Sequence, residues 1–132
     1  MESGSAGWES LPRSRFGDGP ALADELLGLV LSGRKRATCW SAAEGVKGTA
    51  VGGCWVAEDG QGRPRAVLET VALDLLNFNQ VDASFSALEG EGDRTLAYWR
   101  EAHRDYFSRN GGFSEDMPLW CERFELVAAL PV

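Results

Sequence analysis

Three consecutive cations in the segment SGRKRATCW are the residues whose types and spacing most readily suggest chemistry. Arg34, Lys35 and Arg36 follow a glycine and lead directly into Thr38 and an aromatic ring. Adjacent positive charges attract anions, and each cation disfavours the protonation of its neighbours, so we expect a lowered pKa for Lys35. A lysine with a lowered pKa can act as a base or as a nucleophile. The alternative is a solvated basic turn after a helix, where cations interact favourably with the helix dipole.

The relative orientation of Lys35 and Thr38 depends on the local backbone. On a regular strand Thr38 shares a face with Arg36, and Lys35 alternates to the other face. A twist or bulge at the junction after Gly33 would allow Lys35 and Thr38 to converge. Spacing alone leaves both arrangements open.

An acidic run, EGEGD, is the second candidate for chemistry. Glu89, Glu91 and Asp93 alternate with glycines in it. Carboxylates in this pattern can hold a divalent metal or supply a general base. The run lacks the further ligands of a calcium loop, so we predict no cofactor and keep a divalent metal as an alternative. The other interpretation is a flexible acidic linker that caps the next helix. In each case the run is the expected electrostatic partner of Lys35.

The aromatic and sulfur-containing residues carry weaker predictions. An aromatic ring beside a basic cluster is what stacks an unpaired nucleobase, so Trp40 is a candidate binding residue, whereas Trp55 is expected in the core. His103, the single histidine, lies on the apolar face of a predicted helix and is also expected in the core. The three cysteines form no CxxC pair, which argues against a disulfide framework and a tetrahedral zinc site.

The charge distribution limits the partners of the chain. The protein has 132 residues and a net charge of −7, which argues against nonspecific binding of nucleic acid through bulk attraction. Cationic and acidic residues balance in residues 1–65, and the excess of negative charge lies wholly in residues 66–132. A polyanion is therefore expected to meet only a local patch, of which GRKRAT is the densest.

Alternating helical and strand patterns predict the elements that position these residues. A helix is expected to start at Asp18 or Gly19, with Pro20 in its first turn and Gly33 just past its end, and RATCW reads as a strand. The later elements are a hairpin of strands 54–57 and 65–75, a helical turn over 80–88, a helix capped by Asp93 that ends at residues 110–112, and a final strand within 113–127. Short glycine-rich connections favour an α+β fold with a small mixed or antiparallel sheet, open or closed into a barrel.

Length and terminal composition predict one domain. We expect residues 1–15 to be a flexible N-terminal segment and residues 16–132 to be the domain. The start of the chain has no basic and apolar leader, and no stretch approaches the roughly 20 apolar residues of a membrane span. A cytoplasmic location without membrane contact is the expectation.

Four segments in this order resemble the ASCH domain family, from about Phe16 to Val127. They are ALADELLGLVLSGRKRATC, VGGCWV, EGEGDRTLAYWREAHRDYF and FSEDMPLWCERFELV. The resemblance implies a PUA-like fold, a small and mostly antiparallel β-barrel flanked by helices, with a cleft beside the barrel. It also implies an association with RNA: some small members hydrolyse acylated cytidine nucleosides, and a bacterial member of the longer type is described as a ribonuclease.

The family motif G-x-K-x-x-T assigns roles by position. Lys35, Thr38 and Glu91 correspond to the catalytic residues of the amide-hydrolysing members, and Ser114 of FSEDMPL is a further cleft residue. We expect Arg34 and Arg36 to hold phosphate or sugar oxygens. The loop after Thr38 is shorter than in relatives of this type, which carry a tyrosine and a lysine there. Trp40 and Lys47 are the residues that stand in for them.

The predicted function is hydrolysis of RNA or of a modified, acylated nucleoside in the cleft. Lys35, activated by Glu91, would serve as base or nucleophile, with Thr38 positioning the carbonyl group. In an RNA-cleaving version Lys35 would stabilise the charge that develops on the phosphate. The alternative is a non-catalytic module or sensor that binds RNA, a nucleoside or a nucleotide.

Overall fold

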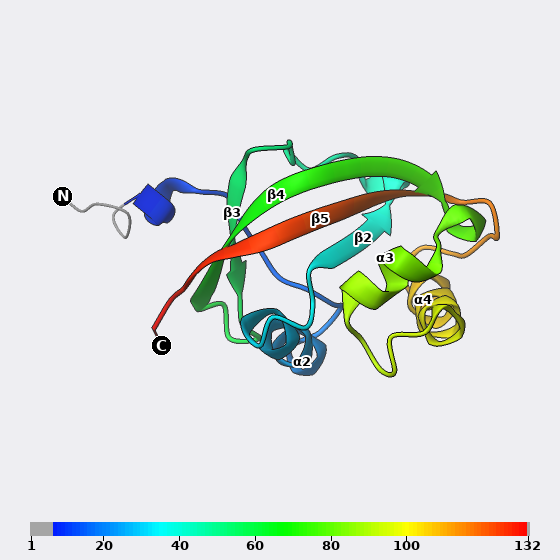
Figure 1. The fold of residues 1–132 in the computed structure, drawn as a ribbon, viewed down its shortest axis with the longest axis horizontal. Coiled ribbons are helices and arrows are strands. Elements are labelled where there is room, and N and C mark those ends of the chain that lie inside the picture. Colours follow the sequence, from blue (N-terminus) through cyan, green and yellow to red (C-terminus); the bar gives the residue numbers. More distant parts are fainter. Residues whose placement is uncertain (1–6, 132) are drawn as a thin grey trace.

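The protein forms a mixed α+β fold in which one bent sheet carries three α-helices along one side (Figure 1). The computed structural model describes residues 7–131. In chain order the regular elements are β1 (Arg13–Ser14), α2 (Pro20–Leu31), β2 (Ala37–Ser41), β3 (Cys54–Glu58), β4 (Pro64–Asn77), α3 (Ala83–Glu89), α4 (Leu96–Arg109) and β5 (Pro118–Ala129). Short 3₁₀ turns lie at Trp8–Ser10, Ala42–Glu44 and Phe78–Gln80.

The sheet is open, whereas the sequence resemblance implied a closed barrel. Its strand order is β1-β3-β4-β5-β2, and the pairings are antiparallel except for the parallel pair β1 and β3. Within residues 7–131, β1 and β2 do not pair, so both remain edges of the sheet. Register shifts near Leu68 and Val71 interrupt the long β4–β5 ladder, and such bulges bend strands without closing them. Within residues 7–131 the sheet is therefore curved but open, and the predicted closed barrel is not formed (Figure 1).

The helices begin and end where local sequence chemistry predicts, with one correction. Pro20 occupies the first turn of α2, where its fixed φ and missing N–H cost nothing. Helix α4 is capped by Thr95, whose side chain accepts a hydrogen bond from the N–H of Tyr98, and not by Asp93. Asp93 instead accepts hydrogen bonds from the backbone N–H and the hydroxyl of Thr95. It therefore positions the cap.

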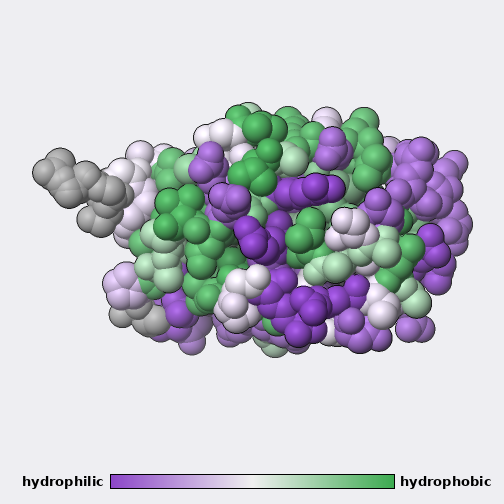
Figure 2. Space-filling view, in the orientation of Figure 1, coloured by the Kyte–Doolittle hydropathy of each residue, from purple (hydrophilic) through white to green (hydrophobic). Residues whose placement is uncertain are grey.

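Two hydrophobic clusters hold the helices against the sheet. In the first, α2 packs through Leu27 and Val30 on Leu68 and Phe124 of the central strands. In the second, α3 and α4 pack on the opposite end of the sheet through the residues Ala37, Phe78, Phe85, Trp99, Phe107, Leu119 and Cys121. Strand β5 contributes to both clusters, which explains why its apolar residues do not follow simple alternation. On the face shown in Figure 2, hydrophobic side chains over the strands are interrupted by hydrophilic ones.

Residues just before the predicted boundary at residue 16 pair with the sheet. Arg13 and Ser14 pair with Val56 and Ala57 of β3, and the Arg13 side chain donates to Glu58 at 2.6 Å. The first part of the predicted flexible segment, residues 1–6, lies outside the described residues. None of the helices in residues 7–131 has the length and apolar character needed to cross a bilayer.

Candidate functional site

Two adjoining cavities open between the N-terminal segment, the sheet and α4. The main cavity, of about 440 Å³, lies between residues 12–17, β2, β3 and the loop 44–50. The side cavity, of about 240 Å³, lies between α2, the end of α3 and α4. They share the lining residues Phe16, Gly17, Thr38, Cys39 and Tyr106. Thr38 and Cys39 of β2 therefore mark the boundary between the cavities.

The backbone after α2 brings Lys35 and Thr38 to the same cavity. Gly33 adopts a φ of 84°, and the N–H groups of Arg34 and Lys35 both donate to the carbonyl of Leu29. Lys35 thus belongs to the turn that ends the helix and precedes β2, so strand alternation does not apply to it. Lys35 and Thr38 both line the side cavity. The two residues therefore reach one cavity although they do not alternate on a regular strand.

Lys35 is a buried ammonium group enclosed by two carboxylates. Its Nζ lies 2.6 Å from Oε1 of Glu89 and 2.9 Å from Oε2 of Glu91, and 3.3 Å from the carbonyl oxygen of Glu89. The residue is only 2% exposed. An ammonium group has three donors, so these acceptors use all of them.

The predicted lowering of the Lys35 pKa is wrong. Burial alone would lower this pKa, but the negative charges of Glu89 and Glu91 raise it well above its ordinary value. The neighbouring cations are not among the main causes of this shift. The Arg34 side chain turns to the carbonyls of Gly90 and Gly92, and Arg36 is exposed at the surface. Lys35 consequently stays protonated and acts as a fixed positive charge.

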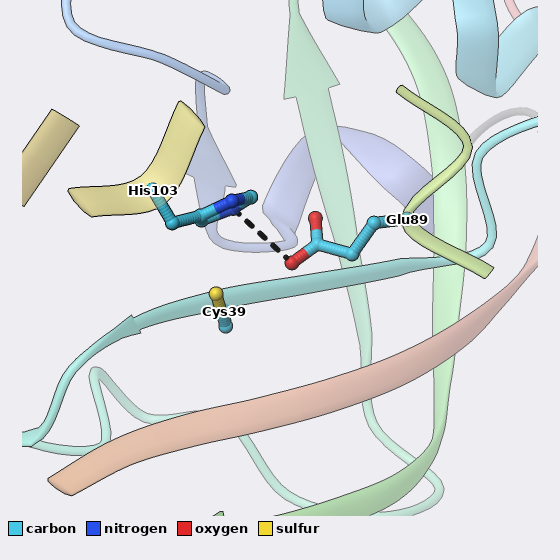
Figure 3. Close-up of side chains that lie close together, drawn as sticks. All are labelled: Cys39, Glu89 and His103. Carbon is cyan, nitrogen blue, oxygen red and sulfur yellow. Dashed lines mark ion pairs between the residues drawn. The ribbon is translucent and has the colours of Figure 1, made fainter. Parts of the chain in front are cut away.

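Glu89, the first carboxylate of EGEGD, is the centre of a buried polar cluster whose contacts with Trp99 and His103 the sequence did not predict (Figure 3). Its Oε2 accepts a hydrogen bond from Trp99 Nε1 at 3.1 Å and lies 3.5 Å from Nε2 of His103. The other ring nitrogen of His103, Nδ1, lies 2.9 Å from the carbonyl oxygen of Trp99. A carbonyl only accepts, so Nδ1 carries a proton, and a second proton on Nε2 would face Glu89. His103 is therefore an ion-pair partner as well as the expected core residue.

The pKa values within this cluster move in the directions that mutual pairing requires. Burial disfavours the charged forms of both Glu89 and His103. The Lys35 and His103 charges nevertheless lower the pKa of Glu89, and the Glu89 charge raises the pKa of His103. Burial and the nearby Glu89 raise the pKa of the Cys39 thiol, which favours its neutral form.

The same cluster is the place where a metal ion would have to compete with Lys35. Ligand atoms of Cys39, Glu89 and His103 lie within 4.8 Å of one another (Figure 3). A cation bound there would share the Glu89 carboxylate with the Lys35 ammonium and the Trp99 N–H, and would need a deprotonated thiol. The three carboxylates of EGEGD do not gather either, because Asp93 turns to the cap of α4. Neither arrangement fits a resident metal well.

The main cavity contains a buried carboxyl group, Glu122, that no sequence motif assigned. Strand pairing sets Glu122 of β5 opposite Thr38 of β2, so the two side chains share a face of the sheet. Oε2 of Glu122 accepts hydrogen bonds from Thr70 Oγ1 at 2.6 Å and Trp55 Nε1 at 3.0 Å. Burial raises the pKa of Glu122, and these hydrogen bonds offset part of the rise. The sequence signal that could have identified Glu122 was an acidic residue on the apolar side of the final strand.

Two predicted binding residues line the main cavity at its outer side. Trp40 donates through Nε1 to the carbonyl of Gly45 at 2.8 Å, and Lys47 Nζ lies 5.6 Å from the centre of the Trp40 ring. Lys47 also pairs with Glu44 at 2.6 Å. These contacts orient the Trp40 ring at the cavity wall.

The other predicted binding residues line neither cavity. Arg34 holds the EGEGD loop through backbone carbonyls, and Arg36 lies on the surface 4.0 Å from Glu125. Ser114 donates to Asp116 at 3.1 Å in the loop before β5. Besides Lys47, the cations that line the main cavity are Arg13 and Arg15, from the segment predicted to be flexible.

Comparison with known proteins gives one family. A family model described as the ASCH domain matches residues 13–128. The structure of an ASCH domain from Lactobacillus crispatus is 36% identical and aligns with a TM-score of 0.81 over 93% of this chain and 83% of that chain. A solved protein structure from Enterococcus faecalis is 34% identical, with a TM-score of 0.80 over 89% of this chain and 77% of that chain. None of the curated proteins compared with the chain matches its sequence.

Proposed function

The chain belongs to the ASCH domain family, which is generally RNA-associated, and on this premise we propose that it hydrolyses a modified nucleoside or RNA in the paired cavities. The observation that carries the proposal is the convergence of Lys35, Thr38 and Glu91 on the side cavity, directly beside a larger cavity lined by aromatic residues. The main cavity has the volume of an ordinary small-molecule site. It would hold the nucleoside, and the side cavity would perform the chemistry.

The protonated state of Lys35 changes the mechanism from the one expected. A protonated Lys35 cannot serve as the base, so we assign that role to Glu91. The Glu91 side chain is 18% exposed, and in the described structure only its Oε2 contacts Lys35. Glu91 takes a proton from water as the water oxygen bonds to the acyl carbon. The Lys35 charge and the Thr38 hydroxyl stabilise the oxyanion that forms. When the carbon–nitrogen bond breaks, the proton passes from Glu91 to the leaving amine, giving a carboxylic acid and the free nucleoside.

Cleavage of RNA is the second hydrolytic version. Arg13 and Arg15 at the main cavity provide charges for phosphate groups, and the Lys35 charge would stabilise the phosphorane-like transition state. The two versions release different products, acid plus nucleoside in one case and shortened RNA in the other.

Binding without turnover is the competing function, and one specific observation favours it. All three donors of Lys35 are already satisfied by Glu89 and Glu91, as in a purely structural ion pair. In this version the same cavities capture a nucleoside or an RNA end, and Lys35 only maintains their shape.

Product analysis with a matched pair of variants tests the hydrolytic proposal. The protein is incubated separately with N4-acetylcytidine and with single-stranded RNA, and acetate, cytidine and RNA fragments are quantified. Glu91→Gln is expected to slow turnover about 100-fold or more, the usual contribution of a general base. Glu101→Gln, an exposed position on α4, is the control and is expected to match the wild type. Absence of products from both substrates, or an active Glu91→Gln, would contradict hydrolysis.

A further inference from the structure

Glu122 is a buried carboxyl group that the hydrolytic scheme does not use, although it lines the main cavity. The residue is 2% exposed. Its Oε2 is held by the Thr70 hydroxyl and the Trp55 indole. Within the described part of the chain no cationic side chain pairs with it, so its charge is not neutralised by the protein.

The second oxygen of Glu122, Oε1, opens onto the cavity. Among residues 7–131, Oε1 has no hydrogen-bond partner. A side-chain polar atom in that range that is completely covered and has no partner occurs only at Arg65 Nε, so Oε1 is not completely covered. Oε1 must therefore keep contact with the cavity space. Because two donors hold Oε2, the carboxyl group is fixed, and Oε1 presents an acceptor in a defined direction. A ligand that fills the cavity displaces water from Oε1, and leaving this acceptor unpaired would be costly, so a ligand that supplies an N–H group is favoured there.

The surroundings of Oε1 identify the chemistry of that ligand. The cavity wall contains the rings of Phe16, Trp40, Trp55 and Tyr106, which suits a flat heterocycle. Carboxylates read nucleobases by accepting hydrogen bonds from amino groups such as N4 of cytosine. Building on the proposed nucleoside site, we propose that Glu122 Oε1 accepts a hydrogen bond from the exocyclic amino group of the bound base and thereby selects amino-bearing bases.

The position of Thr38 connects this contact to the chemistry. Thr38 is the cross-strand partner of Glu122, and the β-carbons of such pairs lie about 4.5–5.5 Å apart. An acyl group carried by the exocyclic nitrogen would then reach Thr38, at the boundary with the side cavity that contains Lys35 and Glu91. The Glu122 contact is thus consistent with the acylated nucleosides of the proposed function when the acyl group is on the base nitrogen. Nucleosides acylated on a sugar hydroxyl would place the acyl group elsewhere.

Equilibrium binding of unacylated nucleosides tests the contact. Titration followed by tryptophan fluorescence compares cytidine with uridine, and adenosine with inosine, on the wild-type protein. One good base contact discriminates by about five- to hundredfold, so the amino-bearing member of at least one pair should bind more tightly by that factor. N4-methylcytidine keeps one N–H group and should bind like cytidine if the pyrimidine is preferred. N4,N4-dimethylcytidine has none and should fall to the level of uridine.

The corresponding variants are Glu122→Gln and, as the control, Glu125→Gln on the same strand. Glu125 is exposed and lines neither cavity, so its variant should keep the preference of the wild type. Glu122→Gln should lose most of the preference, because its amide offers a donor or a weaker neutral acceptor. Equal binding within both pairs, no binding of any nucleoside, or an unchanged preference in Glu122→Gln would overturn the proposal. If Glu122→Gln does not fold, the methylated nucleosides decide the matter on the wild type.

The outcome separates this inference from the proposed hydrolysis. None of the nucleosides in the titration carries an acyl group. A preference that depends on Glu122, without turnover of either N4-acetylcytidine or RNA, would support base selection and contradict hydrolysis. Turnover without a preference for amino-bearing bases would support hydrolysis and contradict base selection by Glu122.

Discussion

At the scale of single residues, the account depends on Lys35 being a buried charge that two glutamates hold in place. Sequence reasoning predicted the partner loop correctly, because an acidic run beside a cationic triplet is a local electrostatic signal. It missed the direction of the Lys35 pKa, because that direction depends on which neighbours are buried with the lysine. Arg34 and Arg36 are adjacent in sequence but turn away, whereas Glu89 and Glu91 are distant in sequence and face it.

Removing the Lys35 charge is expected to destabilise the fold strongly. Lys35→Met leaves the buried Glu89 carboxylate without its main partner, which typically costs about 3–5 kcal/mol. Adding Glu89→Gln should recover part of the loss, because the uncompensated charge is then gone. Urea unfolding of the single and double variants measures both effects. Lys47→Met removes a half-exposed ion pair and should change the free energy of unfolding by no more than about 1 kcal/mol. A Lys35→Met variant as stable as the wild type would refute the buried pair.

The single histidine gives a direct view of the Glu89 charge. The pKa of His103 is raised above 6.5 in the folded protein, so its ion pair contributes stability that is fully present below pH 6.5 and is lost as the pH rises through the folded pKa. The stability difference between wild type and His103→Gln should therefore shrink between pH 6 and strongly alkaline pH. An NMR titration of the one imidazole C–H signal should give a pKa above 6.5. A pKa below 6.5 would mean that Glu89 does not face a protonated ring.

At the scale of elements, the turns around α2 and α3 position the site. The helix and hairpin boundaries were largely predictable, because Pro20, Gly33 and the paired strand patterns act locally. The open sheet could not be predicted, because whether β1 and β2 meet depends on bulges in the distant β4–β5 ladder. Nor could the sequence place Glu122 beside Thr38, since that neighbourhood arises from the register of β2 on β5.

The close approach of Gly90 to the turn that contains Lys35 can be tested by substitution. Gly90 ends α3 with a φ of 73°, and an added methyl group would collide with the backbone of Arg34 and Lys35. Gly48 has the same φ of 73° with open space around it. Gly48→Ala should cost only the roughly 1–2 kcal/mol of a left-handed backbone, whereas Gly90→Ala should cost clearly more. Thermal unfolding compares the two, and equal losses would show that the contact between the loops is not tight.

At the scale of the whole molecule, the acidic surface limits how RNA can bind. The net charge is −7, and the cations that line the main cavity are Arg13, Arg15 and Lys47. Three phosphate contacts give a slope of about −2 for the logarithm of affinity against the logarithm of salt concentration on single strands. Binding of a short RNA between 50 and 300 mM salt, followed by fluorescence anisotropy, should show a slope no steeper than this. A much steeper slope would place RNA on a larger surface outside the cavities.

The central claim is that the acyl-bearing nitrogen of a nucleoside lies between Glu122 and Thr38, and one crystal structure tests it directly. The slow variant Glu91→Gln should retain N4-acetylcytidine in the main cavity. The account predicts the amide N–H within hydrogen-bond distance of Glu122 and the acetyl oxygen within hydrogen-bond distance of the Thr38 hydroxyl. A nucleoside bound in any other position or orientation, or cavities that stay empty at saturating nucleoside, would contradict it.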